Sequence, residues 1–218
     1  SGSFTMGKEV ASFEEQFAQK FSIKHAVMSN SGSSANLLAM NAIRFSSHSP
    51  SKRRNEVIVP AVSWSTTFYP IVQAGFKLKF VDIDLNTLNA SAQSIEAAID
   101  QKTAGIFVVN LLGNPSELNE IRQLANDHGL FMLEDNCESM GASVDGKLAG
   151  TFADIGTFSS FFSHHISTME GGLSVTNSEE LQQVMTSLRA HGWTRELPDE
   201  NYVHNKSGDP FDDLFRFV

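Results

Sequence analysis

The sequence predicts an α/β fold, a mainly parallel β-sheet with helices on both faces. Two observations support this prediction. Apolar runs of strand length alternate with segments whose apolar residues recur at helical spacing, and the alternation covers almost the whole chain. The 218 residues are enough for one large domain and too few for two domains of ordinary size. We therefore expect a single three-layer α/β/α domain over residues 1–218.

The first half of the chain contains clear signals for helices and strands. Four apolar residues at helical spacing, from Val10 to Phe21, predict an amphipathic helix. A turn at residues 30–32 separates a short strand from a helix that begins near Ser33, and Pro60 ends a buried strand. In chain order we expect a helix over 9–21, a strand over 24–29, a helix from 33, and strands over 55–60 and 76–84.

The second half continues the alternation. Ser116 precedes a stripe of apolar residues at helical spacing, so we expect it to cap a helix. A proline-bearing polar stretch over 189–210 predicts a long loop. In chain order we expect a helix over 94–99, a strand over 104–110, a helix after 116, strands over 129–135, 156–161 and 173–176, and a helix from 178.

Composition and charge exclude several classes of protein. The formal net charge of -9 argues against a nucleic-acid partner, because phosphate neutralisation needs a basic face. Cys137 is the single cysteine, so no internal disulfide can form. No apolar run is long enough to cross a membrane, and the first eight residues have no apolar signal-peptide core. We expect a soluble, cytoplasmic protein that has no membrane partner.

The start of the helix near Ser33 is a candidate phosphate site. Small residues at a helix start leave backbone N–H groups pointing outward, with the positive end of the helix dipole behind them. Gly32, Ser33 and Ser34 are therefore candidate binding residues. An ordinary serine N-cap is the competing interpretation, since the stretch has neither dinucleotide-binding nor Walker A spacing.

Carboxylates and an aromatic residue follow two of the predicted strands. In open α/β sheets, ligands bind outside the carboxyl ends of the strands, where Asp135 is expected to lie. Glu134 and Glu138 are close to it in sequence, so a structural cap does not easily account for all three acids. Trp64 follows another strand end, where an indole could cover a flat ligand or serve in packing.

Two adjacent histidines stand between an aromatic run and a Glu-Gly-Gly turn. If this segment is extended, neighbouring side chains point to opposite faces, so only one of His164 and His165 can face a given pocket. An imidazole changes protonation near neutral pH and suits proton transfer. A histidine pair without a role is the competing interpretation, because the dipeptide alone specifies no site.

Several segments, in order along the chain, resemble the DegT/DnrJ/EryC1/StrS sugar aminotransferase family of fold-type I vitamin B6 enzymes. The resemblance covers nearly every residue and implies the large domain of such an enzyme, without its C-terminal small domain. These segments are Asn30–Ala35, 60–67, Phe80–Asp84, Glu134–Asp135, Gly156–Ser159 and Glu170–Gly172.

One departure from the family pattern changes the implied chemistry. The family lysine that forms a Schiff base follows the serine equivalent to Ser159 by five places, and His164 stands there in this chain. An imidazole forms no stable imine, so the resemblance implies pyridoxamine 5′-phosphate or pyridoxal 5′-phosphate held noncovalently, with His164 as the acid and base. His165 would be structural.

The resemblance also implies roles for the cofactor-binding residues. Asp135 would pair with the pyridine nitrogen and keep it protonated, and Trp64 would stack on the ring. The amides near Gly32 and Ser33, with the Ser159 hydroxyl, would hold the phosphate. Glu138 would lie near the ring hydroxyl, where the family usually has glutamine or histidine.

With histidine in the lysine position, the chain resembles a subgroup of the family, the 3-dehydratases. These enzymes remove the C3 hydroxyl of a nucleotide-linked 4-keto-6-deoxyhexose. The resemblance implies a GDP-sugar substrate, 4-keto-6-deoxymannose, used for dideoxysugars of the lipopolysaccharide O-antigen. It also implies glutamate as the amine donor and a homodimer. A related dehydratase carries an iron–sulfur cluster, but a four-cysteine site needs four thiolates and this chain has one, so we expect no cluster and no metal.

Two alternatives stay open. An aminotransferase that tolerates histidine would release a 4-amino sugar, whereas a dehydratase releases a 3-deoxy-4-keto sugar and ammonia. A catalytically silent protein of the same fold, acting as a regulator or scaffold, would bind no B6 cofactor.

Overall fold

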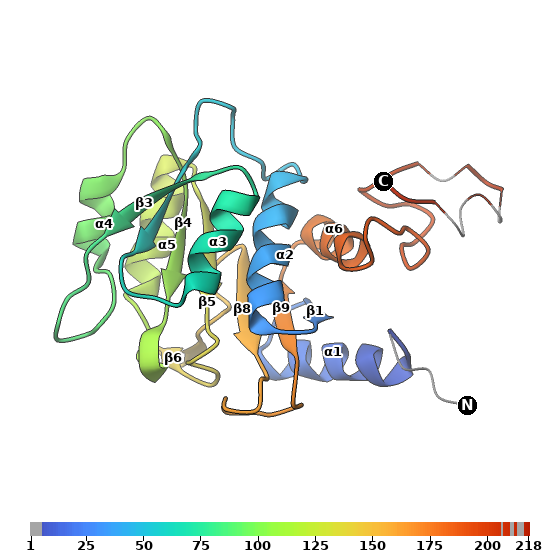
Figure 1. Ribbon diagram of the computed structural model, residues 1–218, viewed down its shortest axis with the longest axis horizontal. Helices are drawn as coiled ribbons and strands as arrows, with labels where there is room; N and C mark the ends of the chain where they lie inside the picture. Colours follow the sequence, from blue (N-terminus) through green and yellow to red (C-terminus); the bar gives the residue numbers. More distant parts are fainter. Residues whose placement is uncertain (1–5, 206, 210–211, 213–215) are drawn as a thin grey trace.

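The computed structural model describes residues 6–205, 207–209, 212 and 216–218. Its main sheet has seven strands in the order β1-β9-β8-β5-β4-β2-β3, and β9 alone runs antiparallel to its neighbours. Figure 1 labels these strands, except β2, and the helices around them. The prediction of a mainly parallel α/β sheet is confirmed.

The helices and strands have the following bounds. The helices are α1 (Lys8–Lys20), α2 (Gly32–Arg44), α3 (Ser65–Gln73), α4 (Ala92–Ala98), α5 (Leu118–His128) and α6 (Glu179–Arg189), with a short 3₁₀ turn η1 (Leu111–Gly113). The strands of the main sheet are β1 (His25–Ser29), β2 (Glu56–Pro60), β3 (Lys77–Val81), β4 (Thr103–Val109), β5 (Phe131–Asp135), β8 (Ile155–Ser159) and β9 (Gly172–Thr176). A separate hairpin consists of β6 (Ser143–Val144) and β7 (Lys147–Leu148).

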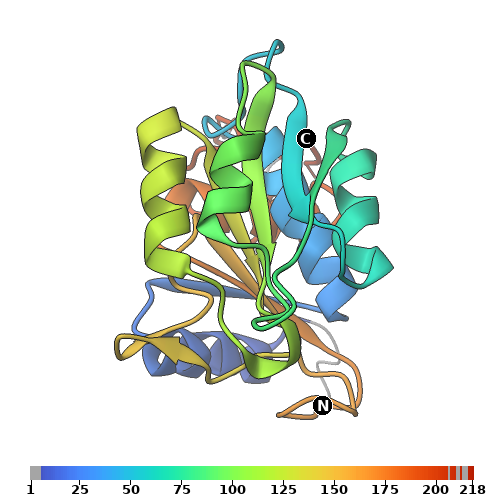
Figure 2. The same ribbon diagram turned by 90° about the vertical axis from the view of Figure 1, so that its left-hand side faces the viewer.

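Alternate residues of the strands face two separate apolar cores. Val57 and Val59 of β2 pack with α2, α3 and α6, whereas Ile58 between them packs with α4 and α5. The central strands β4, β5 and β8 are buried along their whole length, which explains their nearly continuous apolar sequences. Figure 2 shows the strands between helix α5 on one side and helices α2 and α3 on the other.

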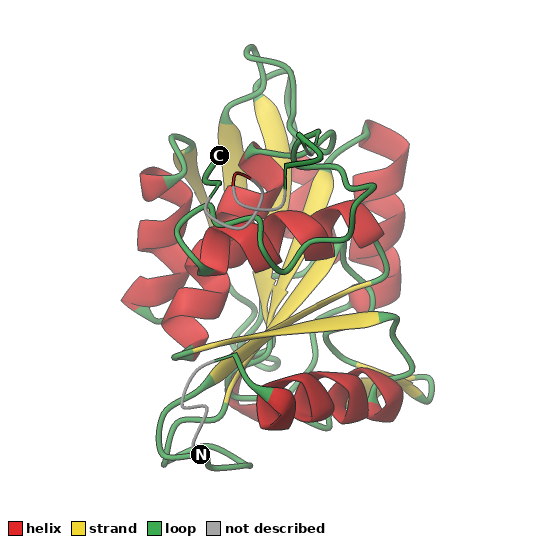
Figure 3. Cartoon of the chain, turned by 90° about the vertical axis from the view of Figure 1, so that its right-hand side faces the viewer, coloured by secondary structure: helices red, strands yellow, loops and turns green. Residues whose placement is uncertain are grey.

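Helix α1 covers the end of the sheet that contains β8 and β9. Its Phe17 and Phe21 rings stack on each other and meet the ring of Phe158 edge-on. Leu173 and Val175 of β9 complete this third apolar cluster. Figure 3 shows α1 close to the N-terminus, below the strands. The predicted phenylalanine stripe is therefore core.

Several local expectations differ from the structure. Residues 65–73, which were not assigned from the sequence, form α3 even though Pro70 lies inside the helix. Ser116 does not cap α5: its hydroxyl donates to the carbonyl of Val109, and Glu117 occupies the N-cap position without a side-chain bond. Ser178, in contrast, accepts the N–H of Leu181 and caps α6.

The predicted loop after residue 189 is confirmed where the structure describes it. Residues 190–205 form no helix or strand of their own, and Trp193 makes an isolated β-bridge with Phe217. Residues 206 and 210 of the predicted loop lie outside the described residues. Within the described part of the chain, no helix is both long enough and apolar enough to cross a membrane.

Candidate cofactor site

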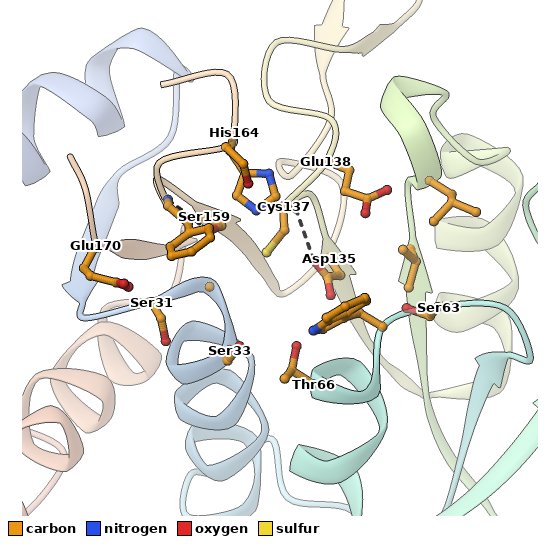
Figure 4. Close-up of a pocket in the computed structure, with 16 residues that line it drawn as sticks. Ser31, Ser33, Ser63, Thr66, Asp135, Cys137, Glu138, Ser159, His164 and Glu170 are labelled. Carbon is orange, nitrogen blue, oxygen red and sulfur yellow. Dashed lines mark hydrogen bonds between the residues drawn. The ribbon is translucent and has the colours of Figure 1, made fainter. Parts of the chain in front are cut away.

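A cavity of about 500 Å³ lies at the edge of the sheet where the parallel strands end. The ends of β4, β5 and β8 and the segments that follow β1, β2, β4, β5 and β8 line it, as expected for an open α/β sheet. Glu170, two residues before the start of β9, also lines it. Figure 4 shows how the lining side chains converge. The lining residues are Ser31, Gly32, Ser33, Ser63, Trp64, Thr66, Val109, Leu111, Asp135, Cys137, Glu138, Ser159, Phe161, Ser163, His164 and Glu170.

Helix α2 begins at the cavity. Ser31 is its N-cap, and the Ser31 side chain accepts the N–H of Ser34. The N–H groups of Gly32 and Ser33 belong to the first turn, so they have no acceptor inside the helix and carry the positive end of its dipole. A phosphate group in the cavity would meet these donors and the Ser159 hydroxyl.

Two glycines allow backbone segments to approach closely at this point. A Cβ atom on Gly32 would lie 2.6 Å from the sulfur of Cys137 and 2.6 Å from the Cβ of Ser159. A Cβ atom on Gly172 would lie 2.1 Å from the carbonyl oxygen of Ser31. The start of α2, the end of β8 and the start of β9 can therefore meet only because both positions lack a side chain. The resulting cradle fits a phosphate bound by backbone groups.

Asp135 ends β5 and is held by three hydrogen bonds. Its Oδ2 accepts from the side-chain amide of Asn36 and from the hydroxyl of Thr67, each at 2.8 Å. Its Oδ1 accepts the backbone N–H of Cys137 at 3.1 Å. The carboxylate is 6% exposed, so these donors replace water around it. Oδ2 thus accepts two of these bonds and Oδ1 accepts one.

Glu134 does not belong to the site, in contrast to the grouping suggested by its sequence position. Adjacent residues of a strand face opposite sides, and the Glu134 carboxylate accepts the backbone N–H groups of Gly150, Phe152 and Ala153 at 2.7 to 2.8 Å. Burial raises its pKa above the usual value, while these hydrogen bonds oppose the shift. Glu134 therefore holds the loop before β8.

Glu138 and Cys137 line the cavity directly after Asp135. Glu138 accepts the backbone N–H of Leu112 at 3.1 Å, which ties the η1 turn to the end of β5. Burial raises the pKa of the Cys137 thiol well above its ordinary value, and the nearby Asp135 carboxylate raises it further. The thiol is thus a neutral wall of the cavity.

His164 lines the cavity, and His165 does not. The segment that carries them is not extended as expected: residues 162–166 form a turn and bends, and the N–H of His164 donates to the carbonyl of Phe161 at 2.9 Å. The hydroxyl groups of Ser160 and Thr168 lie 2.7 Å apart and join the two sides of this loop. His165 is exposed. One imidazole faces the cavity because of this turn, and strand alternation is not the cause.

The remaining predicted residues differ in where they lie. Trp64 is 72% exposed at the cavity wall, so the indole has a free face on which a flat ring could stack. Ser34 is not among the residues that line this cavity, because it lies beside a neighbouring cavity with Leu37 and Arg189. Gly32, Ser33, Asp135, Glu138, Ser159 and His164 line the same cavity.

The sequence analysis did not single out several lining residues. Ser31, Ser63 and Thr66 contribute polar groups to the lining. Glu170 contributes a third carboxylate, in addition to those of Asp135 and Glu138. Ser31 could have been found as the N-cap, whereas Thr66 lies in a helix that the sequence did not predict. None of the lining residues in the described structure is lysine or arginine. Within the described residues, no cluster of histidine, cysteine, aspartate or glutamate is suited to a metal ion.

The fold and this cavity define a class of protein. The chain belongs to the DegT/DnrJ/EryC1/StrS aminotransferase family, whose model matches residues 1–211. It is similar to the GDP-4-keto-6-deoxy-D-mannose 3-dehydratase of Yersinia pseudotuberculosis, with 52% identity over 219 residues that cover 100% of this chain and 56% of that protein.

Two solved structures of GDP-4-keto-6-deoxymannose 3-dehydratase have the same fold. Each has a TM-score of 0.93 and 52% identity to this chain, and the match covers 98% of this chain and 56% of the other. One is a variant with asparagine in place of a histidine and holds GDP-perosamine. The other holds a trapped PLP–glutamate geminal diamine. The chain thus spans little more than half the length of the relatives it matches, and its resemblance to the family is confirmed.

Proposed function

We propose that this chain is the cofactor-binding large domain of a 3-dehydratase that depends on pyridoxamine 5′-phosphate. The substrate would be a nucleotide-linked 4-keto-6-deoxyhexose, specifically GDP-4-keto-6-deoxymannose. One observation carries the proposal: His164 faces the cavity that Asp135 and Trp64 also line, and no lysine is among the described residues that line it. The similarity to dehydratases over the whole of this chain supports it.

The residues present fit the cofactor. The N–H groups of Gly32 and Ser33 and the Ser159 hydroxyl would bind its phosphate, and the Gly32 cradle leaves no room for a side chain there. Trp64 would cover one face of the ring, and Asp135 would accept the ring N–H. When bound, the cofactor supplies an amine that condenses with the sugar ketone and a ring that accepts electrons.

His164 would move the protons. Its imidazole would take a proton from the C4′ carbon of the cofactor and assist departure of the C3 hydroxyl of the sugar. Lysine could perform the first of these steps, but it could also bind the cofactor covalently and compete with the sugar for it. An imidazole allows the cofactor to stay in the amine form.

Three further points complete the proposal. Glutamate would supply the amine, as supported by the PLP–glutamate adduct in a similar structure. The working enzyme would contain a further C-terminal domain, since this chain corresponds to 56% of the Yersinia protein. It would be a homodimer, because Trp64 at the cavity and Tyr69 and Val72 on helix α3 leave apolar side chains exposed. Light scattering tests the dimer.

Product analysis tests the activity. The protein is incubated with pyridoxamine 5′-phosphate, glutamate and GDP-4-keto-6-deoxymannose, and the sugar product is identified by mass spectrometry. A 3-deoxy-4-keto sugar with release of ammonia supports the dehydratase. A 4-amino sugar identifies an aminotransferase instead. Absence of any change in cofactor absorbance when protein is added indicates a silent protein and contradicts the proposal.

A further inference from the structure

Asn36 of helix α2 has every polar atom of its side chain in a hydrogen bond although it lies outside the cavity lining. It is 1% exposed. Its Nδ2 donates to Asp135 Oδ2 at 2.8 Å and to the carbonyl oxygen of Thr66 at 3.3 Å. Its Oδ1 accepts the hydroxyl of Thr157 at 2.5 Å. These contacts connect α2 with the start of α3, with the end of β5 and with the middle of β8.

The orientation of the Asn36 amide follows from its partners. Pro70 has no N–H, so the carbonyl of Thr66 loses the helical hydrogen bond it would otherwise accept four residues later. That free carbonyl can only accept, and it faces Nδ2. On the other side, the single proton of the Thr157 hydroxyl can go to Asn36 Oδ1 at 2.5 Å or to the carbonyl of Glu134 at 3.1 Å. The Thr66 carbonyl and Asp135 therefore decide which way the amide points. A flipped amide would put its oxygen against the Thr66 carbonyl and against Asp135, so the flip is disfavoured.

The fixed amide makes the two oxygens of Asp135 different. Oδ2 receives Asn36 and Thr67, and the Thr67 hydroxyl is in turn 2.9 Å from that of Ser63. Oδ1 receives one backbone N–H, from Cys137. A carboxylate oxygen accepts about two hydrogen bonds, so Oδ2 is saturated and Oδ1 has one position left.

We propose that Asn36 is a positioning residue that saturates Oδ2 of Asp135, so that Oδ1 is the atom that accepts the ring N–H of a bound pyridine cofactor. The Thr66 carbonyl and Asp135 set the orientation of the amide, and the Thr157 hydroxyl holds its Oδ1. The inference deepens the proposed function and rests on it. It assigns roles to Asn36, Thr157 and Pro70, none of which is among the residues that line the cavity.

The first test needs no cofactor. Nitrogen-15 NMR of the side-chain amide of Asn36 measures how fast its protons exchange with water. In the unaltered chain we expect slow exchange, because both protons are in buried hydrogen bonds. Thr157→Val removes the hydroxyl that holds Oδ1 and should speed exchange at least ~10-fold, whereas Thr157→Ser keeps the hydroxyl and should restore slow exchange. Ser174→Ala is the matched control: it removes a buried hydroxyl that donates to the carbonyl of Ala35 in the same helix. Equal exchange in all four proteins would refute the fixed amide.

The second test observes the ring. Pyridoxamine 5′-phosphate labelled with nitrogen-15 in the pyridine ring is added to the unaltered chain, and the ring-nitrogen shift should report a protonated nitrogen. Asn36→Ala and Thr157→Val should move this shift toward that of a neutral ring and weaken binding about 10-fold, the effect of losing a hydrogen bond to a charged group. Ser174→Ala and Thr157→Ser should leave both unchanged.

The outcomes separate the inference from the function it rests on. Failure of the unaltered chain to bind the labelled cofactor overturns the proposed function, and the inference with it. Normal binding with the same ring shift in Asn36→Ala, Thr157→Val and the control overturns the positioning role alone. A Thr157→Val protein that unfolds at the same urea concentration as Ser174→Ala excludes general destabilisation as the cause of an altered shift.

Discussion

The guanidinium of Arg189 and the carboxylate of Glu14 lie 2.5 Å apart, and both also hold Met28 in the edge strand β1. Glu14 accepts the N–H of Met28 at 2.7 Å, and Arg189 donates to its carbonyl at 3.1 Å. The pair thus occupies hydrogen-bonding positions that another strand would take, which protects the edge of the sheet.

Breaking this pair should destabilise the fold. The two side chains are 13% and 18% exposed, so Arg189→Met leaves a largely buried carboxylate without its partner. We expect the free energy of unfolding to fall by about 3 kcal/mol, as measured by urea denaturation. Arg53→Met, at an exposed arginine, is the control and should change it by less than about 0.5 kcal/mol. Similar losses in both variants would contradict the edge-protecting role.

Gly32→Ala should damage the cradle. The added Cβ would lie within 2.6 Å of Cys137 and Ser159, so the start of α2 must shift. Overpacking of this kind costs about 1–3 kcal/mol, and binding of pyridoxamine 5′-phosphate should weaken together with stability. Thermal unfolding and a cofactor titration monitor the two effects. Ser33→Ala, at the next position, adds no atoms and should retain stability, so an equally unstable Ser33→Ala protein would argue against crowding as the cause.

His164→Lys should bind pyridoxal 5′-phosphate covalently. A lysine amine at the cavity wall can form an imine with the cofactor aldehyde, which borohydride then reduces to a stable adduct. Mass spectrometry of the intact protein detects the added cofactor. His165→Lys is a matched control, because that side chain is exposed and is not among the residues lining the cavity. Equal labelling of the two variants would show that residue 164 does not reach the bound cofactor better than an exposed residue does.

Cys137 should react slowly with thiol reagents while the chain is folded. Because burial raises its pKa, the thiol stays protonated as pH rises through about 8.5, where an ordinary thiol ionises. The unfolded chain has no such shift, so at pH 8.5 iodoacetamide should modify it at least ~10-fold faster than the folded chain. Because the pKa of Cys137 is higher in the folded chain than in the unfolded chain, the free energy of unfolding should fall as pH rises above about 8.5. At that pH the unfolded chain loses the thiol proton and the folded chain keeps it. Equal alkylation rates in buffer and in urea would contradict this prediction.

The sequence was informative where function and fold depend on local pattern. Asp135 could be found because a buried apolar strand ends there, and Gly32 and Ser33 because a helix starts there. The predicted strands of the main sheet all exist, with bounds that differ from the expected ones by a few residues. Local signals of this kind need no knowledge of distant segments.

Contacts between distant segments could not be predicted. The Asn36–Asp135 bond joins residues 99 apart, and the Asn36–Thr157 bond joins residues 121 apart. Helix α3 was missed because Pro70 argues against a helix interior, and tertiary contacts compensate for the hydrogen bond it removes. The turn at residues 162–166 was missed because its aromatic run looked like a strand.

The absence of side chains at Gly32 and Gly172 limits how this site can be re-engineered. Its floor consists of main-chain atoms from three segments in close approach, so substitutions there damage the architecture before they alter ligand choice. We expect variation in substrate preference to come from the walls, where Trp64 is open to solvent and the η1 turn contributes Leu111. A library directed at those wall positions would explore new ligands on an unchanged floor.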